Sequence, residues 1–180
     1  MIIENYLRDY KIKKITEFNY MELAEIYTSN DEFFLVTEGE KSDVLGLKNN
    51  ISSVPPNFDL KDKLSLSFWK KDEPIAILDI LKGYPNKESI WIGLLLIHGD
   101  VHSKGIGSEI VDGIIKSACV EGFSIIQLGV IESNKKGLKF WEKQGFRVTS
   151  ESFDIDRKKM VKVLERTTKD GKEEMSNEVL

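Results

Sequence analysis

WIGLLLIHGDVHSKGIGS, residues 91–108, is the stretch of this 180-residue chain that decides its fold. Its beginning, residues 91–97, belongs to an uninterrupted apolar run over residues 90–97, whose length suits a β-strand buried on both faces. A glycine-spaced loop follows at residues 102–108 and leads into a helical pattern. A strand, a glycine loop and a helix in this order direct free backbone N–H groups at phosphate oxygens, and glycine allows close approach because it has no Cβ. The stretch therefore predicts a phosphate-bearing ligand at the start of the helix.

The loop differs from two well-known nucleotide-binding patterns. A P-loop requires Gly, four residues and then Gly-Lys-Ser/Thr, and a dinucleotide fingerprint requires Gly or Ala where Ile110 stands. The loop instead resembles the Gln/Arg-x-x-Gly-x-Gly/Ala signature of the GNAT superfamily of acyl-CoA-dependent N-acyltransferases, with His102, Gly105 and Gly107 at the three fixed places. His102 departs from that signature, although an imidazole can still donate a hydrogen bond.

A second segment strengthens the resemblance. Residues 134–146, NKKGLKFWEKQGF, are similar to the family's Asn-x-x-Ala-x-x-Phe-Tyr-x-Lys-x-Gly-Phe region. The two segments are separated by about 30 residues, which fits one strand–helix–strand unit. The resemblance covers residues 64–146, is looser before them and is absent from the tail.

Composition indicates a globular protein without a nucleic-acid or membrane partner. Hydrophobic residues make up 41% and charged residues 31% of the chain, and the net charge of −4 excludes the basic footprint of a nucleic-acid-binding protein. The longest apolar run is too short to cross a bilayer and the N-terminal segment lacks a secretory pattern, so we expect a cytoplasmic protein. Cys119 is the only cysteine, which excludes an intrachain disulfide and a cysteine metal cluster, and we expect no metal site.

Alternating and helical apolar patterns predict the other elements. Strands are expected over residues 11–15, 64–69, 74–81, 90–97, 123–130, 147–153 and 156–164. Helices are expected after caps at residues 16–19, over residues 42–51, from residue 106 to Gly122, and from Asn134 to residue 143. We expect a single domain over residues 1–166 and a disordered tail over residues 167–180, which is polar and has little to bury.

These elements predict an α/β (α+β) fold: a mixed, mostly antiparallel central sheet flanked by helices on both faces. Strand, helix and strand in sequence require the strands over residues 90–97 and 123–130 to lie parallel. The resemblance implies that these two strands splay apart and admit the pantetheine arm of the cofactor. Gly93 suits a bulge that begins the splay, and it equally suits close packing in a crowded strand.

The resemblance also implies how acetyl-CoA would be held. The backbone of Leu95 and Ile97 would bond the pantetheine amides, and the loop N–H groups would hold the pyrophosphate, with Asn134 either touching the cofactor arm or only capping its helix. For the loop, a tight turn without a ligand is the alternative. The residues expected to bind the cofactor are Leu95, Ile97, His102, Lys104, Gly105, Ile106, Gly107, Ser108 and Asn134.

The catalytic residues depart from the family pattern. Transfer to an amine requires a base that takes a proton, and an acid can protonate the departing thiolate. The family's tyrosine acid is replaced by Trp141, whose indole is no useful acid. Residues 91–93, where many members place a Glu or His, contain no ionisable side chain.

Four other residues are therefore candidates for proton transfer. Asp79 lies on the same strand face as its apolar neighbours, where burial would raise its pKa, and is slightly favoured as the base; a buried structural hydrogen bond is its alternative. Glu88 and His98 are the other candidate bases. The alternative for Glu88 is a place in a solvated turn, and the alternative for His98 is an imidazole ring that faces the loop. Tyr84 is a substitute acid, for which simple packing in a turn is the stronger alternative.

The resemblance predicts an N-acetyltransferase that transfers an acetyl group from acetyl-CoA to a primary amine of a small molecule or peptide, directly within a ternary complex. The missing tyrosine and mid-strand carboxylate leave open a non-catalytic acyl-CoA-binding sensor or interaction module, and a purely structural domain is a third reading. The sequence does not identify the amine, and a homodimer is left open.

Overall fold

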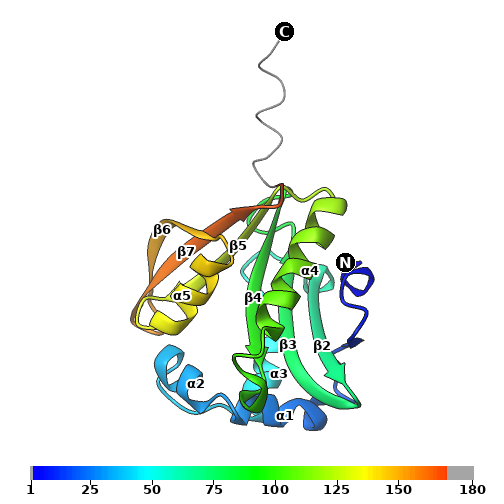
Figure 1. The fold of residues 1–180 in the computed structure, drawn as a ribbon. Coiled ribbons are helices and arrows are strands. Elements are labelled where there is room, and N and C mark those ends of the chain that lie inside the picture. Colours follow the sequence, from blue (N-terminus) through cyan, green and yellow to red (C-terminus); the bar gives the residue numbers. More distant parts are fainter. Residues whose placement is uncertain (1, 170–180) are drawn as a thin grey trace.

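One mixed sheet of seven strands, in the order β1-β2-β3-β4-β5-β7-β6, forms the centre of the computed structural model (Figure 1). The structure describes residues 2–169. The strands are β1 Lys11–Lys14, β2 Lys63–Lys70, β3 Glu73–Lys82, β4 Ser89–Ile97, β5 Ile125–Ile131, β6 Arg147–Asp154 and β7 Lys159–Thr167. Among them only β4 and β5 pair in parallel, so the predicted mostly antiparallel sheet with one parallel pair is confirmed.

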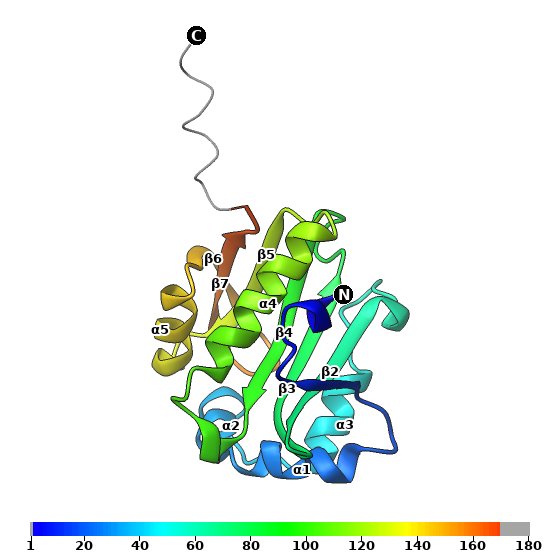
Figure 2. The same cartoon turned by 45° about the vertical axis from the view of Figure 1, so that its right-hand side comes forward.

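Helices cover both faces of the sheet. The helices are α1 Tyr20–Thr28, α2 Asp31–Thr37, α3 Val44–Ser52, α4 Ile106–Val120 and α5 Lys135–Lys143, with short 3-10 turns η1 Ile3–Asn5, η2 Leu60–Asp62 and η3 Gly99–Val101. Figures 1 and 2 show α4 and α5 on one face, which we call the front, and α1 and α3 toward the other, the back. Ile110 and Ile114 of α4 belong to the front core, and Leu23 of α1 and Leu47 of α3 belong to the back core; all four are fully buried.

The strand β4 carries a bulge at Gly93. Asp79 of β3 pairs with Leu94 and Ile80 pairs with Ile92, so Gly93 is the extra residue between them. The bulge exchanges the two faces of the strand, since Ile92 belongs to the front core and Leu94 to the back core. Of the two readings that the sequence left open for Gly93, the structure shows the bulge.

The parallel strands separate directly after the bulge. Pairing between β4 and β5 covers only Ser89 to Ile92 on β4. Beyond this point β4 continues beside β3 as far as Ile97, whereas β5 continues beside β7 as far as Ile131. The predicted splay is therefore present, and it opens toward the loop before α4.

One helix and several element boundaries differ from the sequence prediction. The helix α2 was not expected. It is short and has no side-chain cap, so it lacks the apolar period and the cap signal that predict a helix from sequence. The strand β7 begins at Lys159 instead of residue 156, since the Asp154 side chain accepts from the Arg157 N–H (2.8 Å) and closes a turn there.

The ordered chain also extends past residue 166. Thr167 belongs to β7, and the buried Thr168 donates its hydroxyl to the carbonyl of Phe123 (2.7 Å). The boundary predicted at residue 166 is therefore too early. The rest of the predicted tail, residues 170–180, lies outside the described residues. Across residues 2–169, no helix combines the length and the apolar character that a membrane span requires.

The Asp43 side chain caps α3, because its carboxylate accepts from the N–H groups of Leu45 (2.8 Å) and Gly46 (3.2 Å). We expect Asp43→Ala to lower the free energy of unfolding by about 1 kcal/mol, the usual value of such a cap. Urea unfolding followed by circular dichroism measures this loss. Asp43→Asn keeps an acceptor oxygen and should retain most of the stability; equal losses in both variants would contradict the role of the cap.

Candidate functional site

A cavity of about 1220 Å³ lies where β4 and β5 have separated. Its walls are the α1–α2 junction, the end of β4, the loop before α4 with the first residues of that helix, and one side of α5, which Figure 1 shows grouped around the lower end of β4. The lining includes Leu95, Ile97, His102, Gly105, Ile106, Gly107, Ser108 and Asn134. Of the residues predicted to bind a cofactor, only Lys104 is missing from it, because its ammonium turns back to the Asp100 carbonyl (3.1 Å).

The start of α4 presents unpaired backbone N–H groups to the cavity. Gly105 adopts a left-handed conformation (φ 85°), which glycine tolerates and which turns the loop into the helix. The hydrogen bond from Glu109 N to Gly105 O (3.0 Å) is the first of the helix. The N–H groups of residues 106–108 therefore have no acceptor within the helix, and they carry the positive end of its dipole.

The two motif segments pack against each other at Gly107. A Cβ on Gly107 would lie 3.1 Å from Cζ and 3.2 Å from Cε2 of Phe140, so the ring rests directly on the glycine. Beside it, the Gln144 amide donates to the Ser108 hydroxyl (3.0 Å). The glycine at the third fixed place thus allows α5 to approach the loop, which the sequence pattern alone did not reveal.

Asn134 lies at the opposite wall of the cavity. Its side chain accepts from the Gly137 N–H (2.9 Å) and caps α5. The cap is thus present, and the contact with a cofactor arm stays a prediction.

The free edge of β4 is partly satisfied by two side chains. His98 N–H donates to the Ile75 carbonyl on β3 (2.8 Å). Because backbone groups alternate in direction along a strand, those of Leu95 and Ile97 point to the gap. The Ile97 carbonyl there accepts from Asn30 Nδ2 and bonds with His102 Nε2, both at 2.8 Å. The backbone N–H of Ile97 is therefore the group that is left for a ligand.

Sequence reasoning missed Asn30. This residue is buried at the junction of α1 and α2, and its amide also donates to the Ile26 carbonyl (2.7 Å). It thereby ties the junction to the end of β4. In the sequence, Asn30 resembles any helix-flanking asparagine, and its partner Ile97 lies far along the chain, so no local pattern indicated the contact.

Asp79 is held in a buried ion pair. Its carboxylate lies 2.9 Å from Lys63 Nζ and accepts from the Ser65 hydroxyl (2.6 Å), and both charged side chains are only 4% exposed. Burial raises the pKa of Asp79 above its ordinary value, although Ser65 and Lys63 oppose the shift. The carboxylate also lies behind the bulge, since a Cβ on Gly93 would be 3.2 Å from Asp79 Oδ2. Asp79 is therefore the predicted catalytic residue that the fold brings to the splay.

None of the four candidates is among the residues that line the cavity, although His98 stands between the lining residues Ile97 and Gly99. The His98 ring accepts from the Asp100 N–H (3.2 Å) through Nδ1, and its Nε2 lies 3.9 Å from Glu25 on α1. Glu88 is exposed before β4, at the end of that strand remote from the splay. Tyr84 packs between two other aromatic rings on the back of the sheet.

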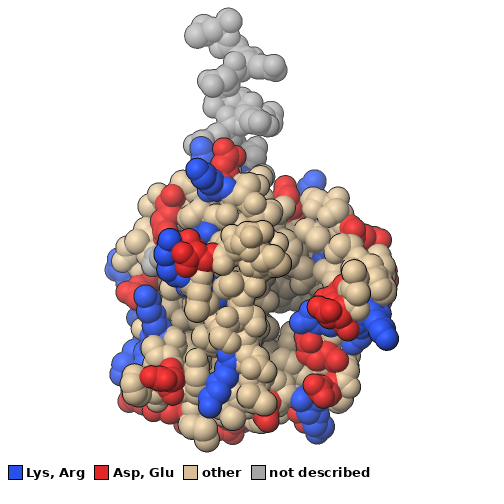
Figure 3. Space-filling view, turned by 180° about the vertical axis from the view of Figure 1, so that it is seen from behind, with Lys and Arg blue, Asp and Glu red and all other residues tan. Residues whose placement is uncertain are grey.

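Two exposed glycines flank the gap between the separated strands, Gly93 on β4 and Gly129 on β5. Leu128 and Val130 belong to the front core, so Gly129 between them faces the back. Figure 3, seen from behind, shows the surface hollowed between an uncharged ridge and a charged right-hand rim. A ligand in the front cavity and a second molecule at the back would thus meet at this gap. Within residues 2–169, no three His, Cys, Asp or Glu residues are grouped to hold a metal ion.

Comparison with known proteins relates this geometry to one family. The sequence model of the acetyltransferase (GNAT) family matches residues 23–146. A search for relatives among curated proteins gave no significant match.

Solved structures share the fold at low identity. An acetyltransferase from Thermus thermophilus superimposes with a TM-score of 0.73 at 20% identity, covering 88% of this chain and 96% of that one. The ribosomal-protein-S18-alanine N-acetyltransferase from Escherichia coli gives 0.63 at 11% identity, covering 91% and 97%. The GNAT domain of S. lividans PAT gives 0.65 at 17% identity, covering 88% and 90%.

Replacing Lys63 with Met would leave the Asp79 carboxylate buried without its cation. We expect Lys63→Met to lower the free energy of unfolding by about 3 kcal/mol at pH 8 and by clearly less at pH 5. The pKa of Asp79 is already raised, and loss of Lys63 raises it further. The folded state then keeps a proton that the unfolded state releases, so stability is present at low pH and falls as the pH rises through the folded pKa.

Urea unfolding at the two pH values measures the difference. Lys61→Met is the control, because the Lys61 side chain is 74% exposed and its loss should cost the same small amount at both pH values. An equal loss for Lys63→Met at both pH values would show that Asp79 does not carry the charge.

Proposed function

The chain belongs to the acetyltransferase (GNAT) family and is an acyltransferase, and on this premise we propose that it transfers the acetyl group of acetyl-CoA directly to a primary amine of a small molecule or peptide. The observation that carries the proposal is the meeting of the α4 N-terminus, the free edge of β4 and the gap between β4 and β5 in one cavity. This arrangement offers sites for a pyrophosphate, an amide-containing arm and a reacting centre in a line.

The pyrophosphate of acetyl-CoA would bind at the start of α4. The free N–H groups of residues 104–108 and the helix dipole favour an anion there. Lys135 and Lys143 also line the cavity and add positive charge. The pantetheine amides would then bond the gap-facing backbone of Leu95 and Ile97; at Ile97 only the N–H is available, because Asn30 and His102 already engage the carbonyl.

The reaction would take place at the gap. The uncharged amine attacks the thioester carbonyl, a C–N bond forms, the C–S bond breaks, and CoA leaves as the thiolate. A backbone N–H near Ile97 would stabilise the developing oxyanion, and holding both reactants in one site supplies much of the rate. The thiolate needs little assistance, since an alkyl thiol such as that of cysteine has a pKa of about 8.5.

Asp79 would receive the proton of the amine through a water molecule. Its raised pKa brings the carboxylate closer to the range of an effective base at neutral pH. Gly93 leaves no side chain between the carboxylate and the gap. Trp141 cannot substitute for the family's tyrosine acid, because its indole is 9% exposed and packs between the rings of Phe140 and Phe146.

A non-catalytic acyl-CoA sensor is the alternative, and one observation favours it. Asp79 is already paired with Lys63, so its carboxylate is stabilised in the charged state and is a weaker base than an unpaired one. Release of free thiol from acetyl-CoA in the presence of an amine separates the two functions, because a sensor would bind the cofactor without turnover.

The cofactor site is tested by Gly107→Glu, which places a carboxylate against Phe140 at the expected pyrophosphate position. We expect the Kd for acetyl-CoA to rise about 100-fold or more, through steric exclusion and charge repulsion. Isothermal titration calorimetry measures the affinity. Val120→Glu adds the same charge at the exposed far end of α4 and should leave the Kd unchanged. Wild-type affinity in Gly107→Glu would refute the site.

The proton acceptor is tested by Asp79→Asn. We expect kcat to fall about 100-fold, the lower range for loss of a general base, with the Kd for acetyl-CoA unchanged. Thiol release over a range of pH gives kcat, and thermal unfolding verifies that the variant is folded. Glu88→Gln is the comparison, since Glu88 lies at the remote end of β4. Normal turnover in Asp79→Asn would remove Asp79 from the mechanism.

A further inference from the structure

Three aromatic side chains, Phe58, Tyr84 and Trp91, form a continuous row at the back of the sheet, which we call the aromatic row. The ring centroids of Phe58 and Tyr84 lie 5.8 Å apart at an interplanar angle of 87°, and those of Tyr84 and Trp91 lie 5.8 Å apart at 84°. Each ring therefore meets the next edge to face. All three side chains are partly exposed, so the row presents apolar surface to solvent.

The row ends at the gap between β4 and β5. Ile90 and Ile92 belong to the front core, so Trp91 between them faces the back. Its Cζ2 atom lies 3.4 Å from the position that a Cβ on Gly129 would occupy. The indole thus extends from β4 over β5, where a larger residue at 129 would displace it.

The reacting groups lie beside this end of the row. The gap is bordered by exposed Gly93, and the Asp79 carboxylate lies directly behind that glycine. A molecule packed on Trp91 therefore lies beside the opening at Gly93, behind which the Asp79 carboxylate is held. The row, the gap and the carboxylate share the back face of the sheet.

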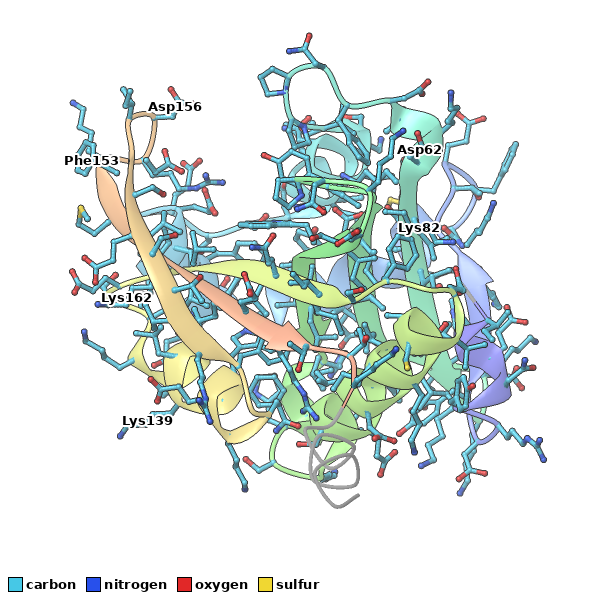
Figure 4. All side chains as sticks on the ribbon, turned by 90° about the horizontal axis from the view of Figure 1, so that it is seen from above. Asp62, Lys82, Lys139, Phe153, Asp156 and Lys162 are labelled. Carbon is cyan, nitrogen blue, oxygen red and sulfur yellow. The ribbon has the colours of Figure 1, made fainter. Side chains whose placement is uncertain are left out.

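The back face has the form of a groove. In Figure 4 the tip of the β6–β7 hairpin, marked by Phe153 and Asp156, and the segment that leads to Asp62 both project toward the back of the sheet. Figure 3 shows the hollow between an uncharged ridge and a charged rim. The groove therefore has one side without charged residues, and a ligand that fills it gains no ionic contact there.

Some carboxylates near this face already have partners. Arg157 Nε lies 2.7 Å from Glu38, and Arg157 Nη1 lies 2.7 Å from Asp154. Glu165 accepts from the Gln127 amide (2.8 Å). The two ion pairs of Arg157 lower the negative charge that could attract the second ammonium group of a polyamine at the hairpin tip. A peptide would place its polar backbone against apolar rings, which costs free energy wherever hydrogen bonds are lost.

We propose that the acceptor is a primary amine on a planar aromatic body, which packs against the aromatic row while its amine reaches the gap beside Asp79. The inference rests on the proposed transfer reaction and names its substrate class. Planar rings gain from edge-to-face and stacked contacts that saturated chains cannot make. The products are an N-acetylated arylalkylamine and CoA.

Thiol release from acetyl-CoA with matched amines tests the proposal. The amines are 2-phenylethylamine, its saturated analogue 2-cyclohexylethylamine, n-butylamine and putrescine. We expect kcat/KM for 2-phenylethylamine to exceed each of the other values by about tenfold. Trp91→Ala should remove this advantage and leave kcat/KM for n-butylamine and the Kd for acetyl-CoA unchanged. Phe18→Ala removes an aromatic ring that is 89% exposed and should change nothing.

Calorimetric titration of 2-phenylethylamine into the CoA-saturated protein provides a readout without turnover, with binding expected in the wild type and lost in Trp91→Ala. Preference for putrescine or for a lysine-containing peptide would overturn the aromatic class. An equal loss for all amines in Trp91→Ala would show that Trp91 is only structural. Binding of 2-phenylethylamine without thiol release from acetyl-CoA in the presence of any of the amines would instead support the aromatic row as a binding site and refute the proposed acetyl transfer.

Discussion

The separation of β4 from β5 after Ile92 is the constraint on which the rest of the structure depends. Two strands that part in the middle of a sheet leave backbone N–H and C=O groups without their ladder partners, and buried groups of this kind must be satisfied elsewhere. Asn30 and His102 satisfy the Ile97 carbonyl, and the gap-facing N–H groups remain for a ligand. The same separation creates the cavity in front and the opening at the back. The proposed cofactor site and the proposed reaction site thus have one structural origin.

The bulge at Gly93 connects the separation to the chemistry. It exchanges the faces of β4, so that the strand contributes to the front core before the bulge and to the back core after it. It also removes the side chain that would cover Asp79. The Asp79 carboxylate on β3 thereby lies directly beside Gly93 of β4. Lys63 opposes the rise that burial causes in the pKa of this carboxylate, and its positive charge helps to explain how an acid can be tolerated at a site that is 3% exposed.

Local patterns predicted the strand, loop and helix of residues 91–108, the parallel pair and the cap at Asn134, because each depends on neighbouring residues. They also left the bulge at Gly93 as one of two readings. They did not predict α2, which is too short for a clear period and is fixed by its contacts, among them Lys159 Nζ with the Val36 carbonyl (2.8 Å). Nor did they reveal the Asn30–Ile97 bond or the Lys63–Asp79 pair, since tertiary contacts between distant residues leave no local signature. Glu88 was selected by its closeness to β4 in sequence, but it lies at the wrong end of that strand.

The most direct measurement is a titration of the ¹⁵N-labelled protein with acetyl-CoA, followed through backbone amide chemical shifts. We expect the largest shifts on Ile97 and on residues 105–108, which line the cavity, with smaller shifts at the start of α5. Saturation with the largest shifts on β1, β2 or the N-terminal turn, or the absence of any shift with a folded protein, would contradict the assignment of this cavity to the cofactor.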